Sequence, residues 1–198
     1  MTLESVSGVI ATACGAAFVW PQVVRVYRRK TTQGLSAATV VIGLINPVFW
    51  TVFGYSTGRT IAVFANTHVG IAFMLIAAKL VRAGELRARL VLAMFAGTVA
   101  YCLSANSISP QIVGVTGLFV STPSFLPQLW RALRSRDLYG VSIWSNVLFA
   151  VQCLFWTIYG VEVREPLYIY PNAFLLPCAL VIARQVWRSR RSLRVGAS

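Results

Sequence analysis

Acidic residues and histidine are scarce in this sequence. Its 198 residues include five aspartates and glutamates and a single histidine. The sequence offers no serine–histidine–aspartate set, no paired carboxylates at a plausible site and no cluster of metal ligands, and hydrolases and metalloenzymes depend on such groups. We therefore expect a protein that is not an enzyme and that holds neither a metal ion nor an organic cofactor.

Charge of either sign is also rare, at 12% of residues, whereas 57% are hydrophobic and the mean hydropathy is +0.70. An ordinary soluble domain carries about twice that share of charged residues. All four cysteines fall within apolar runs and none has C-x-x-C spacing, so we interpret them as small buried side chains. The composition indicates a polytopic membrane protein.

Long apolar segments are what the sequence has in abundance. A helix that crosses the hydrocarbon core needs roughly 17–25 residues. Seven segments meet or approach this length, and the fourth is the shortest: 5–27, 37–57, 60–81, 90–104, 111–133, 143–161 and 166–187. We therefore predict an all-α membrane protein with seven transmembrane helices.

Basic residues give a formal net charge of +13. Such a charge can indicate nucleic-acid binding, but the distribution of these residues along the chain favours a role in membrane topology. With the N-terminus outside, sixteen of the eighteen lysines and arginines fall in inner loops or the C-terminal tail, and only Arg59 and Arg164 fall outside. The positive-inside rule therefore predicts a cytoplasmic C-terminus, and we expect the cell membrane as the location. The first segment lacks a basic leader and follows Glu4, so no cleavable signal peptide is expected.

The chain contains an internal repeat. Residues 8–81 align with 114–187 at a constant offset of 106 without a gap, and about sixteen of the 74 positions are identical. The identities include polar and geometrically demanding residues: Pro21/Pro127, Gln22/Gln128, Arg25/Arg131, Arg28/Arg134, Gly34/Gly140, Ser36/Ser142, Trp50/Trp156, Gly54/Gly160 and Asn66/Asn172. Such a set indicates duplication, because hydrophobic residues alone would match by chance in so apolar a chain.

The repeat predicts the domain organisation. We expect a first three-helix repeat over 5–82, a linker transmembrane helix over 88–105, a second three-helix repeat over 111–187 and a basic tail over 188–198. A three-helix unit begins and ends on opposite sides of the membrane, so one extra crossing is needed to make the two copies parallel. The linker helix has this topological role.

Each repeat carries a proline–glutamine pair, Pro21–Gln22 and Pro127–Gln128, near the predicted inner face. Proline removes a backbone donor and clashes with the preceding turn, so both helices should kink at the same depth. We predict a hinge or inner gate here, with a static kink as the alternative. The Gly-x-Ser motifs that follow, ending in Ser36 and Ser142, are typical of a turn and a helix N-cap.

In each copy an asparagine lies sixteen residues after a tryptophan: Trp50 is followed by Asn66, and Trp156 by Asn172. Eight residues up to the turn and eight down place both side chains about 12 Å below it, too deep for an interfacial belt. A single asparagine at this depth is often an interhelical hydrogen-bonding residue. Two symmetric pairs instead predict a central pocket with amide groups and flat apolar faces, which suit a sugar ring.

Other polar residues lie near this predicted pocket. Asn46 and Gln152 align with each other four positions before each tryptophan, on the same helix face. His68 is about 200° around its helix from Asn66, so we expect it to face away from the pocket as a structural residue.

The pattern resembles the PQ-loop superfamily and, within it, the SWEET and SemiSWEET sugar transporters of the MtN3/saliva type. Trp156-Thr-Ile-Tyr159-Gly160 followed by Pro171-Asn172 is similar to the W-x-x-Y-G and P-N signatures of the family's last repeat. The resemblance implies two parallel three-helix repeats around a pocket lined by the tryptophans and asparagines above. It also implies an outer gate at Phe53 and Tyr159.

The first copy departs from the family pattern. Phe53 stands where tyrosine is expected, and Asn66 follows Ala65 rather than a proline. The prolines that eukaryotic members place early in the second helix of each repeat are missing, and Pro47 lies at another depth. A gate formed by Phe53 and Tyr159 would therefore be asymmetric.

Three functions are compatible with the sequence. The first is a sugar uniporter that moves mono- or disaccharides down their gradient by alternating access; no acidic residue falls within a predicted span, so no buried carboxylate would carry a proton. The alternatives are a proton-coupled PQ-loop amino-acid transporter and a non-transporting membrane receptor. Since one chain contains both repeats, a monomer suffices, and a homo-oligomer would serve stability or regulation. A sugar and membrane lipid are the expected partners.

Overall fold

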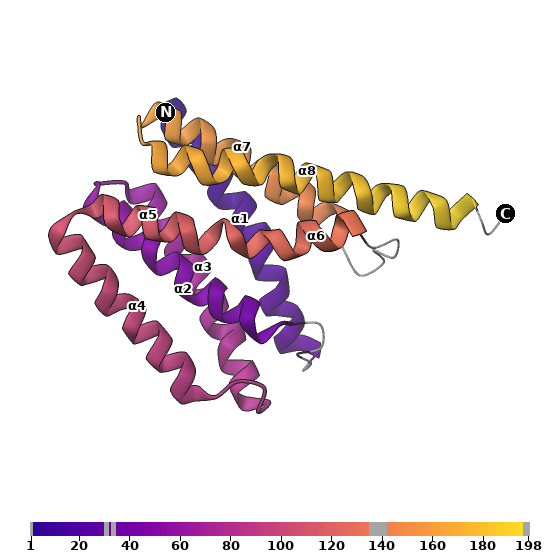
Figure 1. The fold of residues 1–198 in the computed structure, drawn as a ribbon, viewed down its shortest axis with the longest axis horizontal. Coiled ribbons are helices and arrows are strands. Elements are labelled where there is room, and N and C mark those ends of the chain that lie inside the picture. The colour runs from indigo at the N-terminus through magenta and orange to yellow at the C-terminus, as the bar shows by residue number, and fades with distance from the viewer. Residues whose placement is uncertain (1, 30–31, 33–34, 135–141, 196–198) are drawn as a thin grey trace. The chain divides into compact units, whose positions relative to one another are not determined.

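The computed structural model describes residues 2–29, 32, 35–134 and 142–195, and every regular element in these ranges is a helix (Figure 1). The prediction of an all-α protein is therefore confirmed. The elements are α1 (Leu3–Arg29), α2 (Ala37–Ser56), α3 (Thr60–Arg82), α4 (Ala88–Ile108), α5 (Pro110–Ser121), the 3₁₀ turn η1 (Pro123–Phe125), α6 (Leu126–Arg134), α7 (Ile143–Glu162) and α8 (Pro166–Val195).

Six helices in the described ranges are long and apolar enough to cross a membrane: α1, α2, α3, α4, α7 and the Pro166–Ser189 part of α8. The fourth predicted span is longer than expected, since α4 has 21 residues. The segment expected as a tail after residue 187 continues α8 as helix to Val195. The chain is thus a multi-pass membrane protein by the length and composition of its helices.

The fifth predicted span is not one helix. It is divided into α5, the turn η1 and α6, with the interruption at Thr122–Phe125. Pro123 and Pro127 each lack a backbone N–H, so two successive turns lose a hydrogen bond. The first copy has Ala17 where the second has Pro123, and α1 continues as a single helix through Pro21. The sequence predicted the same kink in both copies, but the first helix of the first copy is continuous and that of the second copy is interrupted.

The second helices of the two repeats match residue for residue. Helices α2 and α7 both have 20 residues, and they begin and end 106 positions apart. Ser36 Oγ accepts a hydrogen bond from the Thr39 N–H (3.4 Å), and Ser142 Oγ accepts one from the Ser145 N–H (3.2 Å). The predicted N-caps are confirmed, while the glycines of the Gly-x-Ser motifs lie outside the described residues.

The turns into α3 and α8 also share one geometry. Gly58 has φ +71°, and Arg164 at the equivalent position has φ +54°. In each turn the next residue donates its N–H to the carbonyl five positions earlier, that of Gly54 (2.7 Å) or Gly160 (2.9 Å). This is a left-handed C-terminal cap, which glycine adopts without strain and arginine does not.

Arg164→Gly is expected to raise stability by about 0.5–1 kcal/mol, because it removes the side chain from a left-handed conformation. The measurement is the thermal unfolding midpoint of the purified protein in detergent. The reciprocal variant Gly58→Arg is the matched control and should lower the midpoint. A lower midpoint for Arg164→Gly would contradict this explanation of the turn.

The chain forms two compact units that differ from the sequence repeats. One unit comprises Met1–Cys14 and Thr122–Ser198, and the other comprises Gly15–Ser121. Each unit therefore contains most of one repeat together with the N-terminal part of the first helix of the other. The chain passes between the units at residues 14–15, within α1, and at residues 121–122, before η1.

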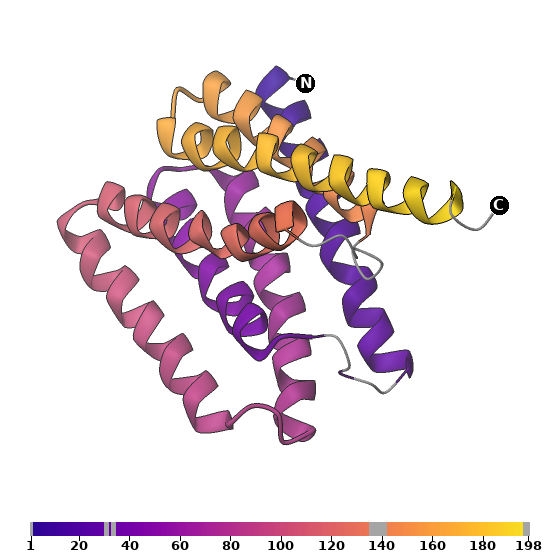
Figure 2. The same cartoon turned by 45° about the vertical axis from the view of Figure 1, so that its right-hand side comes forward.

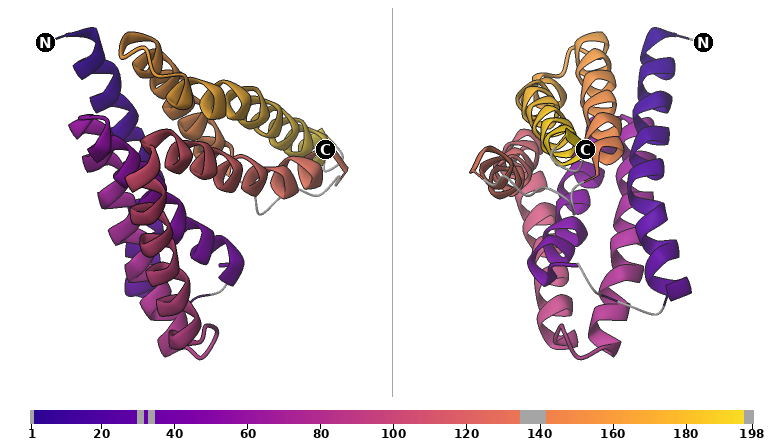
Figure 3. Two further views of the ribbon diagram at one scale, coloured as in Figure 1. Left: turned by 60° about the vertical axis from the view of Figure 1, so that its left-hand side comes forward. Right: turned by 90° about the vertical axis from the view of Figure 1, so that its right-hand side faces the viewer.

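Each unit has its own buried core. In the unit Gly15–Ser121, α2 packs on α3, α4 and α5, and the core cluster is formed by Val19, Val23, Val40, Ala72, Ile76, Ala77 and Leu80. In the other unit α7 lies beside α8 (Figures 2 and 3), and α6 packs on α8 around Ala132, Ile182 and Val186. Ile76 and Ile182 are equivalent positions of the repeat and both are fully buried.

Candidate functional site

The four residues predicted to bind substrate form two half-sites, one in each compact unit. Trp50 on α2 and Asn66 on α3 belong to the unit Gly15–Ser121, whereas Trp156 on α7 and Asn172 on α8 belong to the other. Because the repeat offset is constant, each side chain of one half-site has an equivalent position in the other.

The first half-site centres on the indole ring of Trp50, which is 8% exposed. The ring of Phe53 meets it edge-on, with centroids 6.2 Å apart and an interplanar angle of 82°. Helix α5 passes close by: a Cβ built on Gly117 would lie 2.9 Å from Phe49 Cβ and 3.5 Å from Trp50 Cε2. Glycine at position 117 thus allows the α5 backbone to approach the indole.

The second half-site contains a stacked pair of aromatic rings. Trp156, also 8% exposed, meets Tyr159 edge-on at 5.3 Å and 89°, and stacks with Tyr168 at 5.9 Å and 24°. Tyr168 occupies the position of Ala62 in the first copy. The sequence did not predict this pair, because tyrosine and alanine are both ordinary residues of an apolar helix. The stacking helps to fix the orientation of the Trp156 indole.

The two asparagines make the same hydrogen bond. Asn66 Nδ2 donates to the Ala62 carbonyl and Asn172 Nδ2 donates to the Tyr168 carbonyl, each at 2.9 Å. Each bond stays within its own helix and uses one of the two Nδ2 hydrogens. Among the described residues neither amide oxygen has a hydrogen-bond partner, and neither asparagine bonds to another helix. Each half-site therefore keeps one donor and one acceptor for a ligand.

The residues predicted as an outer gate are fully enclosed. Phe53 is 0% and Tyr159 is 1% exposed, and each lies one helical turn beyond the tryptophan of its own repeat. Their burial holds the edge-on contacts with the indole rings in place. The two copies differ at this position: the ring against Trp50 is phenylalanine, and the ring against Trp156 is tyrosine.

The glycine that ends each W-x-x-[F/Y]-G motif marks a close helix crossing. A Cβ on Gly54 would lie 3.2 Å from Ala62 Cβ. A Cβ on Gly160 would lie 2.7 Å from Ile169 Cγ1 and 3.0 Å from the Ile169 backbone nitrogen. The equivalent backbone nitrogen at the first crossing, that of Val63, would lie 3.3 Å from the Cβ on Gly54, so the second crossing is the tighter one.

Asn46, four residues before Trp50 on α2, has a buried Oδ1 without a hydrogen-bond partner among the described residues. Buried acceptors are rarely left unpaired, so this oxygen is a candidate for a water or a ligand hydroxyl. Gln152 is half-buried at the equivalent position of α7. His68 Nδ1 lies 3.2 Å from the Phe64 carbonyl oxygen of its own helix, whereas its buried Nε2 has no hydrogen-bond partner among the described residues, so its structural role stays a prediction.

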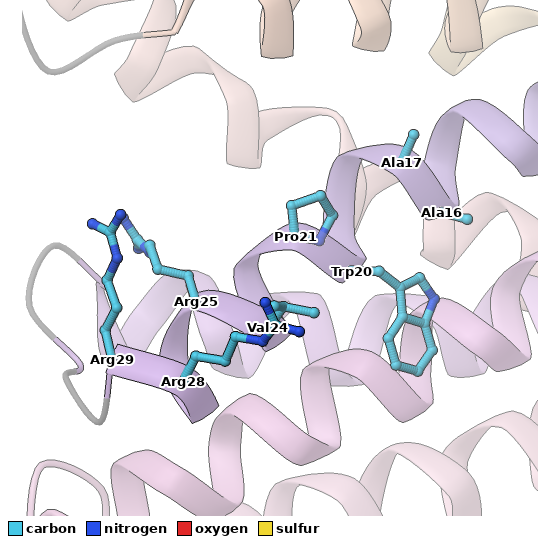
Figure 4. Close-up of a pocket in the computed structure, with 8 residues that line it drawn as sticks. All are labelled: Ala16, Ala17, Trp20, Pro21, Val24, Arg25, Arg28 and Arg29. Atoms are coloured by element: carbon cyan, nitrogen blue, oxygen red, sulfur yellow. The ribbon is translucent and has the colours of Figure 1, made fainter.

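The proline–glutamine pair of the first repeat borders a hollow beside α1 (Figure 4). Pro21 is exposed on α1 and Gln22 is half-buried. In the second repeat Pro127 and Gln128 lie in the first turn of α6, and their side chains are outside the described residues. The hollow has a volume of about 810 Å³ and is lined by Ala16, Ala17, Trp20, Pro21, Val24, Arg25, Arg28 and Arg29.

Comparison with known proteins identifies a repeat type in the first part of the chain and a similar overall fold. Residues 3–62 match the family model described as PQ loop repeat. The chain is also similar to the structure of a eukaryotic SWEET transporter solved at 3.7 Å resolution, with a TM-score of 0.79 over 96% of this chain and 100% of that chain, at 14% sequence identity. Residues 3–62 are thus similar to a PQ-loop repeat, and the chain has the fold of a SWEET transporter structure. No curated protein sequence matches it.

The family-model match covers α1, α2 and the start of α3, including Pro21, Gln22 and Trp50, and ends before Asn66. The second repeat is recognised through the structure, because α7 and the turn into α8 reproduce the first copy at the same offset. The predicted resemblance to the SWEET and PQ-loop proteins is confirmed, and the shared fold accounts for the seven predicted spans.

Proposed function

We propose that this protein is a facilitator that moves a mono- or disaccharide across a membrane down its concentration gradient. Substrate would bind in a pocket lined by Trp50, Asn66, Trp156 and Asn172 that opens alternately to the two sides. The observation that carries the proposal is the identical bonding of the two asparagines, which leaves one amide N–H and one amide oxygen in each half-site.

The chemistry of these groups suits a sugar. Hydroxyl groups both donate and accept hydrogen bonds, so they match an amide that offers one of each. The C–H faces of a sugar ring pack on aromatic surfaces such as the Trp156 indole. The unpaired Oδ1 of Asn46 offers a further acceptor one turn from Trp50. The fold shared with a SWEET transporter supports transport rather than ligand binding alone.

Gating is part of the same proposal. Pro21 with Gln22, and Pro127 with Gln128, would form the hinge or inner gate, and Phe53 with Tyr159 would form the outer gate. We further propose that the N-terminus faces outside and the C-terminus faces the cytoplasm of a cell membrane, as the positive-inside rule favours. A single chain would suffice for transport.

Uniport is favoured over proton coupling by the positions of the acidic residues. Glu4 is the second residue of α1 and Glu162 is the last residue of α7. Glu85 and Glu165 lie between helices, and Asp137 falls outside the described residues. A coupled proton normally needs a carboxylate or histidine inside a span and facing the pathway.

Counterflow of radiolabelled glucose and sucrose into proteoliposomes is the test of this function. We expect uptake of at least one sugar, at a rate unchanged by an imposed proton gradient and similar at two pH values. Accumulation driven by the gradient would instead indicate a proton-coupled PQ-loop transporter. Folded protein that moves neither sugar would contradict the proposal and favour the amino-acid or receptor alternatives, which ligand-induced thermal stabilisation would then separate.

A further inference from the structure

The hollow beside α1 has two chemically different ends (Figure 4). One end is apolar and is formed by Ala16, Ala17, Trp20, Pro21 and Val24. The other end carries the guanidinium groups of Arg25, Arg28 and Arg29. All of these residues belong to α1, so the hollow, of about 810 Å³, is an open groove along one helix rather than an enclosed cavity.

The three arginines form a cluster of like charge. Positions 25 and 29 are four residues apart and positions 25 and 28 are three apart, so their side chains are neighbours on the helix surface and repel one another. All three are exposed, and none of them has an ion-pair or hydrogen-bond partner among the described residues. Glu85, between α3 and α4, accepts a hydrogen bond from the Thr32 hydroxyl instead. An anion from outside the chain would relieve the repulsion.

Another cation on the same side of the protein is already engaged. Lys79 Nζ lies over the Tyr27 ring, 4.4 Å from its centroid, and the Tyr27 hydroxyl donates to the Leu75 carbonyl at 3.2 Å. These contacts hold α1 on α3 immediately beside the cluster. The arginine end of the hollow is therefore attached to a fixed part of its unit.

The spacing along α1 suits a molecule with a charged head and an apolar chain. From Ala16 to Arg25 the helix rises about 14 Å, at 1.5 Å per residue. The positive-inside rule places the arginines at the inner membrane surface, so the apolar end extends into the hydrocarbon region. A small anion would satisfy the arginines and leave the apolar end unfilled.

We propose that this hollow binds one anionic glycerophospholipid of the inner leaflet. Its phosphate and head group contact Arg25, Arg28 and Arg29, and an acyl chain packs along Trp20 and Val24. Arginine suits this role because its planar guanidinium group donates two parallel hydrogen bonds to a phosphate. The lipid is not the transported substrate, although Pro21 of the proposed inner gate lines the same hollow.

Native mass spectrometry of the delipidated protein tests this site, with phosphatidylglycerol and phosphatidylcholine added in equal amounts. We expect preferential binding of phosphatidylglycerol to the wild type. The triple variant R25Q/R28Q/R29Q should bind it about 100-fold more weakly, because each basic residue near an anionic lipid contributes roughly a fivefold factor. The matched control R82Q/R87Q/R89Q removes the same charge from the α3–α4 region and should change binding by less than about threefold.

A second variant tests the apolar end. Val24 is 45% exposed, so V24W should fold normally, fill the hollow and weaken phosphatidylglycerol binding by about tenfold. Thermal midpoints confirm folding of all variants. The proposal is overturned if the wild type shows no head-group preference, if both arginine triples lose binding equally, or if inorganic phosphate competes as well as the lipid does.

Discussion

Asn172→Ala is expected to reduce sugar counterflow at least about 100-fold and to leave the helical fold intact. The variant removes the amide that offers a donor and an acceptor, and leaves two sugar hydroxyls without partners in a site shielded from water. The bond that it breaks within the protein is a local one to the Tyr168 carbonyl, and alanine favours helix more than asparagine does. Thermal midpoint and counterflow are measured on the same preparation.

Two further variants make this result interpretable. Asn66→Ala removes the equivalent amide of the first half-site and should also abolish counterflow, because the proposed pocket needs both. Asn146→Ala on α7 is the control, since Asn146 Nδ2 also donates to the carbonyl four residues earlier at 2.9 Å, that of Ser142, and it lies outside either half-site. Unchanged uptake by Asn172→Ala would show that the asparagine is structural, and the proposed pocket would then be wrong.

Gly160→Val is expected to lower the thermal midpoint by about 5–10 °C and to reduce the yield of monodisperse protein. The first added carbon would already lie 2.7 Å from Ile169 Cγ1 and 3.0 Å from the Ile169 backbone nitrogen, so α7 and α8 would have to separate. Overpacking of this kind costs about 1–3 kcal/mol, and a backbone clash places it at the upper end. Fluorescence-detected size exclusion after heating in detergent gives the measurement.

Gly97→Val is the matched control for this prediction. Gly97 lies in α4, and nothing stands within 4 Å of a Cβ built there. The same substitution should therefore shift the midpoint by no more than about 2 °C. Equal losses for both variants would show that valine is poorly tolerated in any helix of this protein, and that the crossing at Gly160 has no special importance.

The repeat in the sequence predicted local geometry more accurately than it predicted packing. The offset of 106 placed the N-caps at Ser36 and Ser142 and the starts of α2 and α7 at residues 37 and 143, and the structure repeats one turn geometry at Gly58 and Arg164. These features depend on hydrogen bonds within a few residues, so identical residues reproduce them. The interruption before α6 also has a local cause, Pro123, which lies four residues ahead of Pro127. The kink was predicted at Pro127 because the proline–glutamine pair is duplicated, whereas Pro123 has no counterpart in the first copy.

The features that were missed depend on contacts between distant segments. Nothing in the pairing of Ala62 with Tyr168 indicates that Trp156 stacks with Tyr168. The approach of α5 to Trp50 through Gly117 could not be read from spacing, because it joins residues more than 60 positions apart. The division of each first helix between two compact units likewise follows from tertiary packing.

This division sets an order for folding during synthesis. Residues 1–14 belong to a unit whose remaining residues start at Thr122, whereas Gly15–Ser121 form a continuous stretch of chain. At a synthesis rate of roughly 5–20 residues per second, the first residues wait about 5–20 s before the segments that complete their unit begin to appear. The continuous unit can fold as soon as it is made. The start of the first helix is therefore among the last parts of the protein to reach its final packing, although the ribosome makes it first.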